Sequence, residues 1–226
     1  MSEQDIPSNF GDWHLIDTLG GYMPGVTANV FRLGAHLPRI QDLLAVNYRV
    51  ARNPSRANQQ LVFKGVSGVN VYRNPAALPR ARVVHELVQA RSYEELGRLH
   101  ADESFDPRKK AAMLAPPPQL ERCQGAAEPV TFLTMQPARV VLEATLGCRG
   151  MLVLADTAFP GWKAKVDGRQ VALHEVSGAL RGVVVEAGRH RIEMTYRPAS
   201  ATLGAVMTLS GLLGACLLRR RERRPN

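Results

Sequence analysis

The sequence predicts a mixed α+β N-terminal region followed by an antiparallel β-sandwich and one C-terminal transmembrane helix. Three observations lead to this fold class. Residues 1–115 mix helical and strand patterns. Between residues 139 and 197, apolar and polar residues alternate repeatedly between turn signals, which is typical of antiparallel strands. Residues 198–218 carry no charge and are followed at once by arginines.

The N-terminal region contains three recognisable patterns. "RIQDLLAVNYRVA" (39–51) predicts a short helix that runs into a strand. "LVFKGVSGVNVYRNP" (61–75) predicts a hairpin interrupted at Gly68, and "RARVVHELV" (80–88) predicts one more strand. The expected domain, residues 1–115, is therefore mixed in secondary structure.

A helix is predicted next, because Ser92 and Glu95 fit a capping box. We expect this helix to run from about Tyr93 to His100. "APPPQ" at residues 115–119 interrupts regular structure and is the best candidate for a boundary before the sandwich, which we place at 120–197.

The sandwich prediction rests on period-two alternation. In "RVVLEATL" one face carries only apolar side chains, and Asp167-Gly168 is a strong two-residue hairpin signal. The predicted strands include residues 139–146, 162–166, 170–176, 181–186 and 190–196. Short strands with turns at this spacing favour a small β-sandwich.

Residues 198–218 have the length of a membrane span. As a helix they would extend about 31 Å, close to the roughly 30 Å of a hydrocarbon core. The alternative, a buried helix of a soluble protein, does not explain the arginines that follow. By the positive-inside rule the tail, residues 219–226, would be cytoplasmic and residues 1 to about 197 extracytoplasmic.

The N-terminus conflicts with that orientation. "MSEQDIPSNFGDWH" has neither a basic n-region nor an apolar h-region. Either the chain is a tail-anchored cytosolic protein that breaks the charge rule, or it lacks upstream transmembrane helices of the same protein. The second interpretation needs fewer exceptions to these rules. The expected partners are the lipid bilayer and the missing upstream helices of the same protein.

Charge and cysteines constrain the function only weakly. The formal net charge is +9, but much of it lies in the C-terminal arginines, so no nucleic-acid partner is expected. Cys123 and Cys148 either form a disulfide or are two buried thiols, and the second is favoured. Cys216 falls within the predicted span. No spacing of cysteine and histidine indicates a metal, and no cofactor is expected.

Several segments resemble one family. "NPAALPRA" (74–81), "PGWKAKVDG" (160–168) and "RGVVVEAGRH" (181–190) are similar to the C-terminal outer region of the bacterial membrane protein family YfhO. The resemblance implies C-type glycosyltransferase-like relatives with many membrane helices, a lipid-linked sugar donor, and a role in glycosylating envelope polymers such as teichoic acids. The catalytic acid of that family lies in an early loop that this chain does not contain, so whether the chain is an enzyme stays open.

The segment "DTAFPGWKAKVDG" contains the candidate glycan-binding residues. Trp162 and Phe159 offer flat apolar faces to a sugar ring, and Asp156, Lys163 and Arg181 offer hydrogen bonds to hydroxyl or phosphate groups. Alternatively, Trp162 fills the sandwich core and Lys163 is merely solvated. Period two places Trp162 with apolar neighbours and favours this second interpretation.

No catalytic residue and no metal ligand is assigned. Asp102, Glu103 and Asp106 fit a solvated loop better than an acid/base pair. The histidines are isolated in sequence. The expected function is that of a noncatalytic outer domain of a YfhO-like protein involved in lipid-linked sugar transfer or envelope glycosylation. The alternative is a stand-alone membrane-anchored carbohydrate-binding or scaffolding module.

Overall fold

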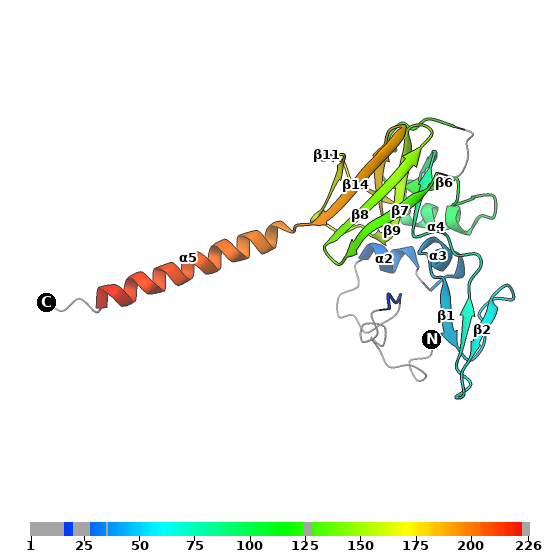
Figure 1. The fold of residues 1–226 in the computed structure, drawn as a ribbon, viewed down its shortest axis with the longest axis horizontal. Coiled ribbons are helices and arrows are strands. Elements are labelled where there is room, and N and C mark those ends of the chain that lie inside the picture. The colour runs from blue at the N-terminus through cyan, green and yellow to red at the C-terminus, as the bar shows by residue number, and fades with distance from the viewer. Residues whose placement is uncertain (1–15, 20–27, 35, 124–127, 223–226) are drawn as a thin grey trace.

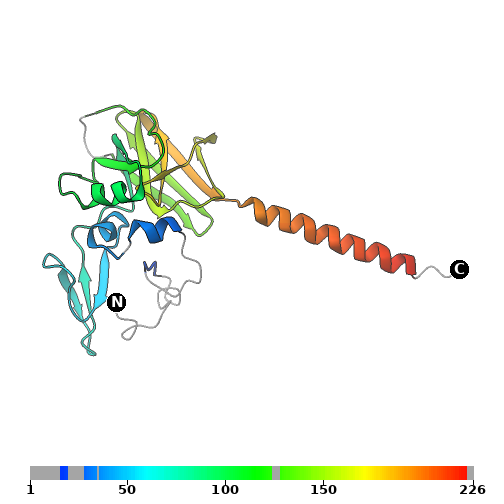
Figure 2. The ribbon, with the colours of Figure 1, turned by 180° about the vertical axis from the view of Figure 1, so that it is seen from behind.

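The computed structural model describes residues 16–19, 28–34, 36–123 and 128–222, and for residues 202 and 214–222 it describes the backbone alone. Most of the regular structure in these residues is β-sheet, with few helices. Two sheets pack face to face, and a long helix projects away from them (Figures 1 and 2). The predicted fold class is therefore corrected to a mostly β protein.

The sandwich consists of a five-stranded sheet, ordered β11-β10-β14-β8-β7, and a four-stranded sheet, ordered β12-β13-β9-β4. All pairings in both sheets are antiparallel. The strands are β4 (Ala81–Val84), β7 (Val130–Gln136), β8 (Arg139–Leu146), β9 (Gly150–Thr157), β10 (Trp162–Val166), β11 (Arg169–Val171), β12 (His174–Val176), β13 (Leu180–Val185) and β14 (Gly188–Tyr196).

The main core lies between these two sheets and follows the predicted alternation of β8. Its buried members include Val140, Leu142, Ala144, Leu146, Leu152, Leu154, Val183, Val185, Ile192 and Met194. A fully buried valine or leucine side chain contributes about 1.5–3 kcal/mol relative to an exposed one. The β-sandwich prediction is confirmed in this respect.

A second core covers the outer face of the four-stranded sheet. In β9, Met151 and Val153 point to this second core, whereas Leu152 and Leu154 point to the first. A strand buried on both faces reads as a continuous apolar run rather than an alternating one. Period-two analysis therefore missed β9.

Two predicted strands prove to be divided. Residues 80–88 form β4 and β5 (Glu86–Gln89), which belong to different sheets and are separated by His85. Residues 170–176 are split between β11 and β12, again in different sheets. Alternation assigns faces to residues, but it does not show where a chain leaves one sheet for the other.

The Asp167-Gly168 hairpin prediction is confirmed. β10 and β11 pair antiparallel with Val166 opposite Arg169, and both turn residues have positive φ, 50° and 80°. Positive φ at both central positions is the geometry that an Asp-Gly turn accommodates, because its twist matches that of the strands.

The N-terminal part adds short elements beside the sandwich. These are α2 (Ala28–Leu33), α3 (Pro38–Leu43), β1 (Tyr48–Ala51), β2 (Gln60–Lys64) and β3 (Asn70–Arg73). β1, β3 and β2 form a three-stranded antiparallel sheet, and Gly68 lies in the β2–β3 turn with φ +80°. The predicted helix-to-strand segment at 39–51 and the hairpin at 61–75 are both confirmed.

Helix α4 (Tyr93–Ala101) joins the parallel pair β5 and β6 (Lys110–Met113). The serine half of the predicted capping box is confirmed, because the Ser92 hydroxyl accepts from the Glu95 backbone N–H at 3.2 Å. Glu95 Oε2 reaches back one residue further than predicted and accepts from the Arg91 N–H at 2.8 Å, not from that of Ser92. Because the first amides of a helix lack intrahelical partners, this cap determines where α4 begins.

The C-terminal helix α5 (Ala199–Glu222) corrects the predicted membrane span. Among the residues that the structure describes, no helix combines the length and the apolar character needed to cross a bilayer. The predicted transmembrane helix over 198–218 is therefore wrong. Glycine, serine and threonine dilute its apolar surface, and the helix continues through Arg219–Glu222 instead of ending before the arginines. The Thr208 and Ser210 hydroxyls bond to backbone carbonyls one turn earlier.

Cys123 and Cys148 form a disulfide, with their Cα atoms 6.3 Å apart. The favoured prediction of two separate buried thiols is wrong. The two cysteines lie in irregular segments at one end of the sandwich, whose meeting depends on the pairing of strands rather than on local sequence. The Cys216 side chain lies outside the described residues.

Candidate functional site

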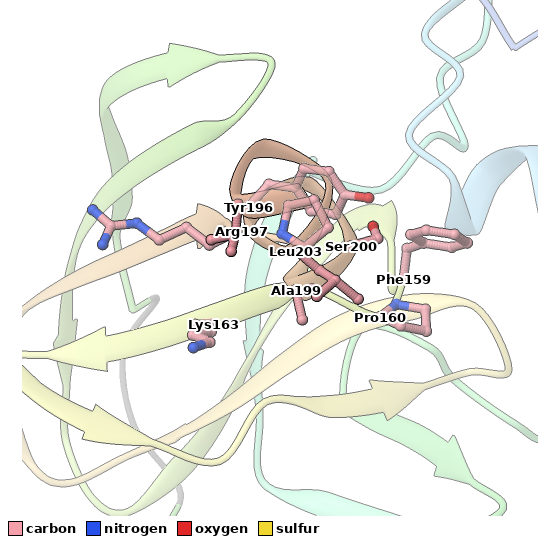
Figure 3. Close-up of a pocket in the computed structure, with 11 residues that line it drawn as sticks. Phe159, Pro160, Lys163, Tyr196, Arg197, Ala199, Ser200 and Leu203 are labelled. Carbon is pink, nitrogen blue, oxygen red and sulfur yellow. The ribbon is translucent and has the colours of Figure 1, made fainter. Parts of the chain in front are cut away.

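An open groove of about 970 Å³ lies where the sandwich meets α5. It is formed by the residues before β10, the end of β14 and the first turns of α5 (Figure 3). Its lining residues are Phe159, Pro160, Gly161, Lys163, Tyr196, Arg197, Pro198, Ala199, Ser200, Leu203 and Val206.

Three aromatic side chains meet at this groove. The ring centroids of Phe159 and Tyr196 are 6.4 Å apart, and those of Trp162 and Tyr196 are 5.5 Å apart. Trp162 is directly opposite Tyr196 in the β10–β14 ladder, which explains their contact. Phe159 is 45% exposed, so its ring is open to a ligand.

Gly161 permits the close packing of the turn before β10 on the end of β14. Its φ is +108°, and a Cβ there would lie 3.0 Å from the Tyr196 ring and 3.1 Å from Pro198 Cα. The Gly161 carbonyl accepts from the Arg197 N–H at 2.8 Å. A side chain at this position would separate the aromatic residues that form the groove.

Two cations lie on the side of the groove away from Phe159. Figure 3 shows Lys163 and Arg197 there, with Tyr196 near the start of α5 and the Phe159 ring beside Pro160. Both Lys163 and Arg197 are exposed. No carboxylate and no histidine is among the described residues that line the groove. Its charge therefore suits a neutral or anionic ligand.

Behind the groove, Trp162 packs against the main core together with Ala164 and Val166, as period two indicated. The Arg181 guanidinium lies 3.8 Å from the Trp162 ring centroid. Arg181 also donates to Asp156 Oδ2 at 2.8 Å. The tryptophan is thus held between the core and a buried cation.

Asp156 is the centre of an ion-pair network. It accepts from Arg181 and also pairs with Arg80 at 2.9 Å, and Arg80 reaches Asp17 as well. Burial lowers the pKa of Arg181, although the Asp156 charge acts in the opposite direction. The network stabilises the cation of Arg181, a residue of which only 4% of the surface is exposed to water.

The structure divides the five candidate glycan-binding residues into two groups. Phe159 and Lys163 line the groove, whereas Asp156 and Arg181 are paired beneath it. Trp162 lies between the two groups, in contact with Arg181 and Tyr196.

Sequence reasoning missed Tyr196 and Arg197 as groove residues. Tyr196 follows Ile192 and Met194 in the alternation of β14, and this pattern predicts a core residue. The weak signal that could have found it is its position at the end of a strand, where a tyrosine has an apolar contact on one side and water on the other.

The other predicted polar groups lie elsewhere. Asp102 and Asp106 bond to backbone N–H groups of the loop after α4, at 2.8 and 3.0 Å, and Glu103 is exposed. This agrees with the interpretation of these acids as loop residues.

Comparison with known proteins gives one match. Residues 124–208 match the family model described as bacterial membrane protein YfhO. The matched segment includes the five-stranded sheet and the start of α5, and it contains most of the groove. The searches of curated proteins and of solved structures each found no match.

Proposed function

We propose that this chain, whose residues 124–208 match the YfhO family model, is a noncatalytic outer domain of a polytopic membrane protein. In this proposal the protein takes part in lipid-linked sugar transfer or in glycosylation of a teichoic-acid-type envelope polymer. The groove between β10, β14 and α5 holds the glycan. Residues 1 to about 197 face the outside of the cell membrane.

The observation that carries the proposal is the exposed ring of Phe159, which lies across the groove from two cations. Apolar faces of pyranose rings pack on aromatic side chains, and a few placed polar groups then set orientation. Lys163 and Arg197 supply donors to hydroxyl or phosphate oxygens on the opposite side of the groove. This combination suits a sugar that carries, or is linked through, a phosphate.

The lining of the groove supports a noncatalytic role. Glycosyl transfer needs a group that accepts or donates a proton at the reacting oxygen. The described lining residues provide no carboxylate and no histidine for this purpose. The groove therefore binds or positions a glycan, and the chemistry takes place in another part of the membrane protein.

The test is a calorimetric titration of the full chain with neutral oligosaccharides and with polyol-phosphate oligomers of the teichoic-acid type. We expect Phe159→Ala and Lys163→Ala to weaken binding about tenfold or more, since each removes one class of contact. Phe63→Ala and Lys165→Ala are matched controls, because Phe63 is 62% exposed on another sheet and Lys165 lies on β10 outside the groove. Equal affinity in all four variants, or no binding, would refute the proposal.

Sidedness needs a separate measurement. A single exposed cysteine placed in the β10–β11 turn would be probed in intact cells with a membrane-impermeant thiol reagent. Labelling of intact cells supports an extracytoplasmic domain. Labelling only after the cells are broken contradicts it, and with it the envelope role.

One observation favours the alternative of a scaffolding module. α5 exposes a series of large apolar side chains, among them Leu203, Met207, Leu209, Leu212 and Leu213, each at least 60% exposed. Such surface is usually covered by a partner. Sedimentation of the full chain in mild detergent distinguishes the two: assembly that an α5 substitution abolishes supports scaffolding, and a monomer excludes self-assembly.

A further inference from the structure

A second cluster of reactive side chains lies at the end of the sandwich opposite α5. β14 begins at Gly188, opposite Leu146, and ends near Arg139 beside the groove. Cys148 lies two residues after Leu146, so the Cys123–Cys148 disulfide lies at the far end of these strands. His85, from the β4–β5 junction, completes the cluster at this end.

The distances from His85 to the two sulfurs are those of a metal site. His85 Nδ1 lies 3.5 Å from Cys148 Sγ and 3.8 Å from Cys123 Sγ. In a tetrahedral zinc site, with Zn–N of about 2.05 Å and Zn–S of about 2.3 Å, neighbouring nitrogen and sulfur ligands are about 3.6 Å apart. The imidazole is therefore already at ligand distance from both sulfurs.

The orientation of His85 is determined by its other nitrogen. Nε2 donates to Glu128 Oε2 at 2.7 Å, and Glu128 Oε1 accepts from the Gly147 N–H at 2.8 Å. A carboxylate that holds the second nitrogen of a histidine is the usual support of a metal-ligating imidazole. The ring also packs on Gly150, where a Cβ would lie 2.7 Å from His85 Cε1.

The remaining polar contacts do not block the site. His85 Nδ1 lies 3.3 Å from the Arg149 carbonyl oxygen, and Cys148 Sγ lies 3.4 Å from the Glu121 carbonyl oxygen. With the Nε2–H donating to Glu128, the neutral imidazole leaves the Nδ1 lone pair available to a metal. All three ligand residues are half-buried, which leaves a path for an ion from solvent.

We propose that reduction of the Cys123–Cys148 disulfide converts this cluster into a zinc site with the ligands Cys123 Sγ, Cys148 Sγ and His85 Nδ1. A dithiol reductant supplies two electrons and two protons and becomes a disulfide, while the S–S bond breaks and two thiols form. Zn²⁺ then displaces the two thiol protons. The sulfurs must separate to about 3.8 Å, the S–S distance in a tetrahedral site.

Zinc is favoured by the chemistry of the ligands. Two thiolates and one imidazole form a soft set that suits Zn²⁺ rather than Mg²⁺ or Ca²⁺. Three protein ligands leave the fourth position to water or to a further group. The disulfide and the zinc complex exclude one another, so occupancy of the site reports the redox state of the two cysteines.

The test uses the full chain with Cys216→Ser, so that only the two cluster cysteines are present. Zn²⁺ affinity is measured by competition with a chromophoric chelator, before and after reduction with a phosphine. Co²⁺ is added in parallel, because its thiolate charge-transfer band reports sulfur ligation. We expect about one equivalent of zinc in the reduced chain and none in the oxidised chain.

Variants separate a built site from adventitious thiol binding. His85→Ala and Glu128→Gln leave both cysteines in place and should weaken zinc binding about 10- to 100-fold. His190→Ala, a histidine paired with Asp167 elsewhere, should change nothing. Equal zinc affinity in His85→Ala and in the parent overturns the proposal, whether or not the reduced chain stays folded. A reduced parent that binds zinc no more tightly than Cys123→Ser/Cys148→Ser also overturns it.

Discussion

His100 makes the stability of the fold sensitive to acid. It lies in the last turn of α4, 6% exposed, with its ring edge-on to Phe105 at a centroid distance of 5.7 Å. Neither ring nitrogen has a hydrogen-bond partner among the described residues. Burial lowers the pKa of His100 to about 4, and the charges of Arg39 and Arg82 act in the same direction.

The direction of the effect follows from which state binds the proton. Above pH 6.5 His100 is neutral in both states and contributes nothing to the pH dependence. As the pH falls below 6.5, the unfolded chain takes up a proton that the folded chain does not, so the free energy of unfolding decreases. The decrease ends near pH 4 and amounts to about 3 kcal/mol for a pKa lowered from 6.5 to about 4.

The variant His100→Leu removes this titration while keeping an apolar side chain of similar size. Urea unfolding of the parent and the variant at about pH 7.5 and pH 4.5 gives the difference in stability at each pH, and other acidic groups cancel in the comparison. We expect the difference to shift by about 2.5 kcal/mol in favour of the variant at the lower pH.

His190 serves as the control with the opposite sign. Its hydrogen bond to Asp167, at 2.6 Å, raises the pKa of His190. Its contribution to stability is therefore present below pH 6.5 and is lost as the pH rises through the raised pKa. A parent and a His100→Leu variant whose unfolding free energies change in parallel between the two pH values would refute the reasoning on His100.

Three further predictions concern packing, charge and capping, each measured as the free energy of unfolding in urea. Gly182→Ala should lower the free energy of unfolding by about 1–3 kcal/mol, because a Cβ there would overlap a valine methyl group and lie 2.8 Å from a methionine sulfur. Gly97→Ala, at a helix position with open space around it, should raise the free energy of unfolding by about 0.5–1 kcal/mol. Asp156→Asn should lower the free energy of unfolding by about 3–5 kcal/mol, because it leaves the buried Arg181 without its charged partner. Glu193→Gln, which removes an exposed ion pair with Arg139, should lower it by less than about 1 kcal/mol. Ser92→Ala should cost about 1 kcal/mol through the lost N-cap, and an unchanged stability would contradict the capping role.

Local patterns predicted the elements whose cause is local. The Ser92 N-cap of α4 and the Asp167-Gly168 hairpin depend on residues within a few positions of each other, and both have the predicted form. The inner face of β8 was also predictable, because Val140, Leu142, Ala144 and Leu146 alternate on the side that faces the core, even though Val141 on the other side is buried too.

The predictions that failed depended on more distant contacts. β9 is buried on both faces, so its sequence does not alternate. The predicted membrane helix relied on the absence of charge over 198–218, but no helix among the described residues is long and apolar enough to cross a membrane. A segment without charge is not necessarily apolar, and only apolar side chains make transfer into lipid favourable.

The candidate site was predictable only in part. Phe159, Trp162 and Lys163 are near one another in sequence, so local sequence was enough to group them as candidates. Tyr196 and Arg197 join them only because β10 pairs with β14, and Arg181 reaches Trp162 only because the two sheets pack face to face.

The sequence by itself determined the Asp167-Gly168 turn, the Ser92 cap of α4, the inner face of β8 and the resemblance to the YfhO family. The tertiary structure alone decided which strands are neighbours, that Asp156 and Arg181 lie beneath the groove, and that His85 meets Cys123 and Cys148. The physical reason is that periodicity and turn chemistry act over a few residues, whereas strand order and sheet packing bring together side chains that are tens of residues apart.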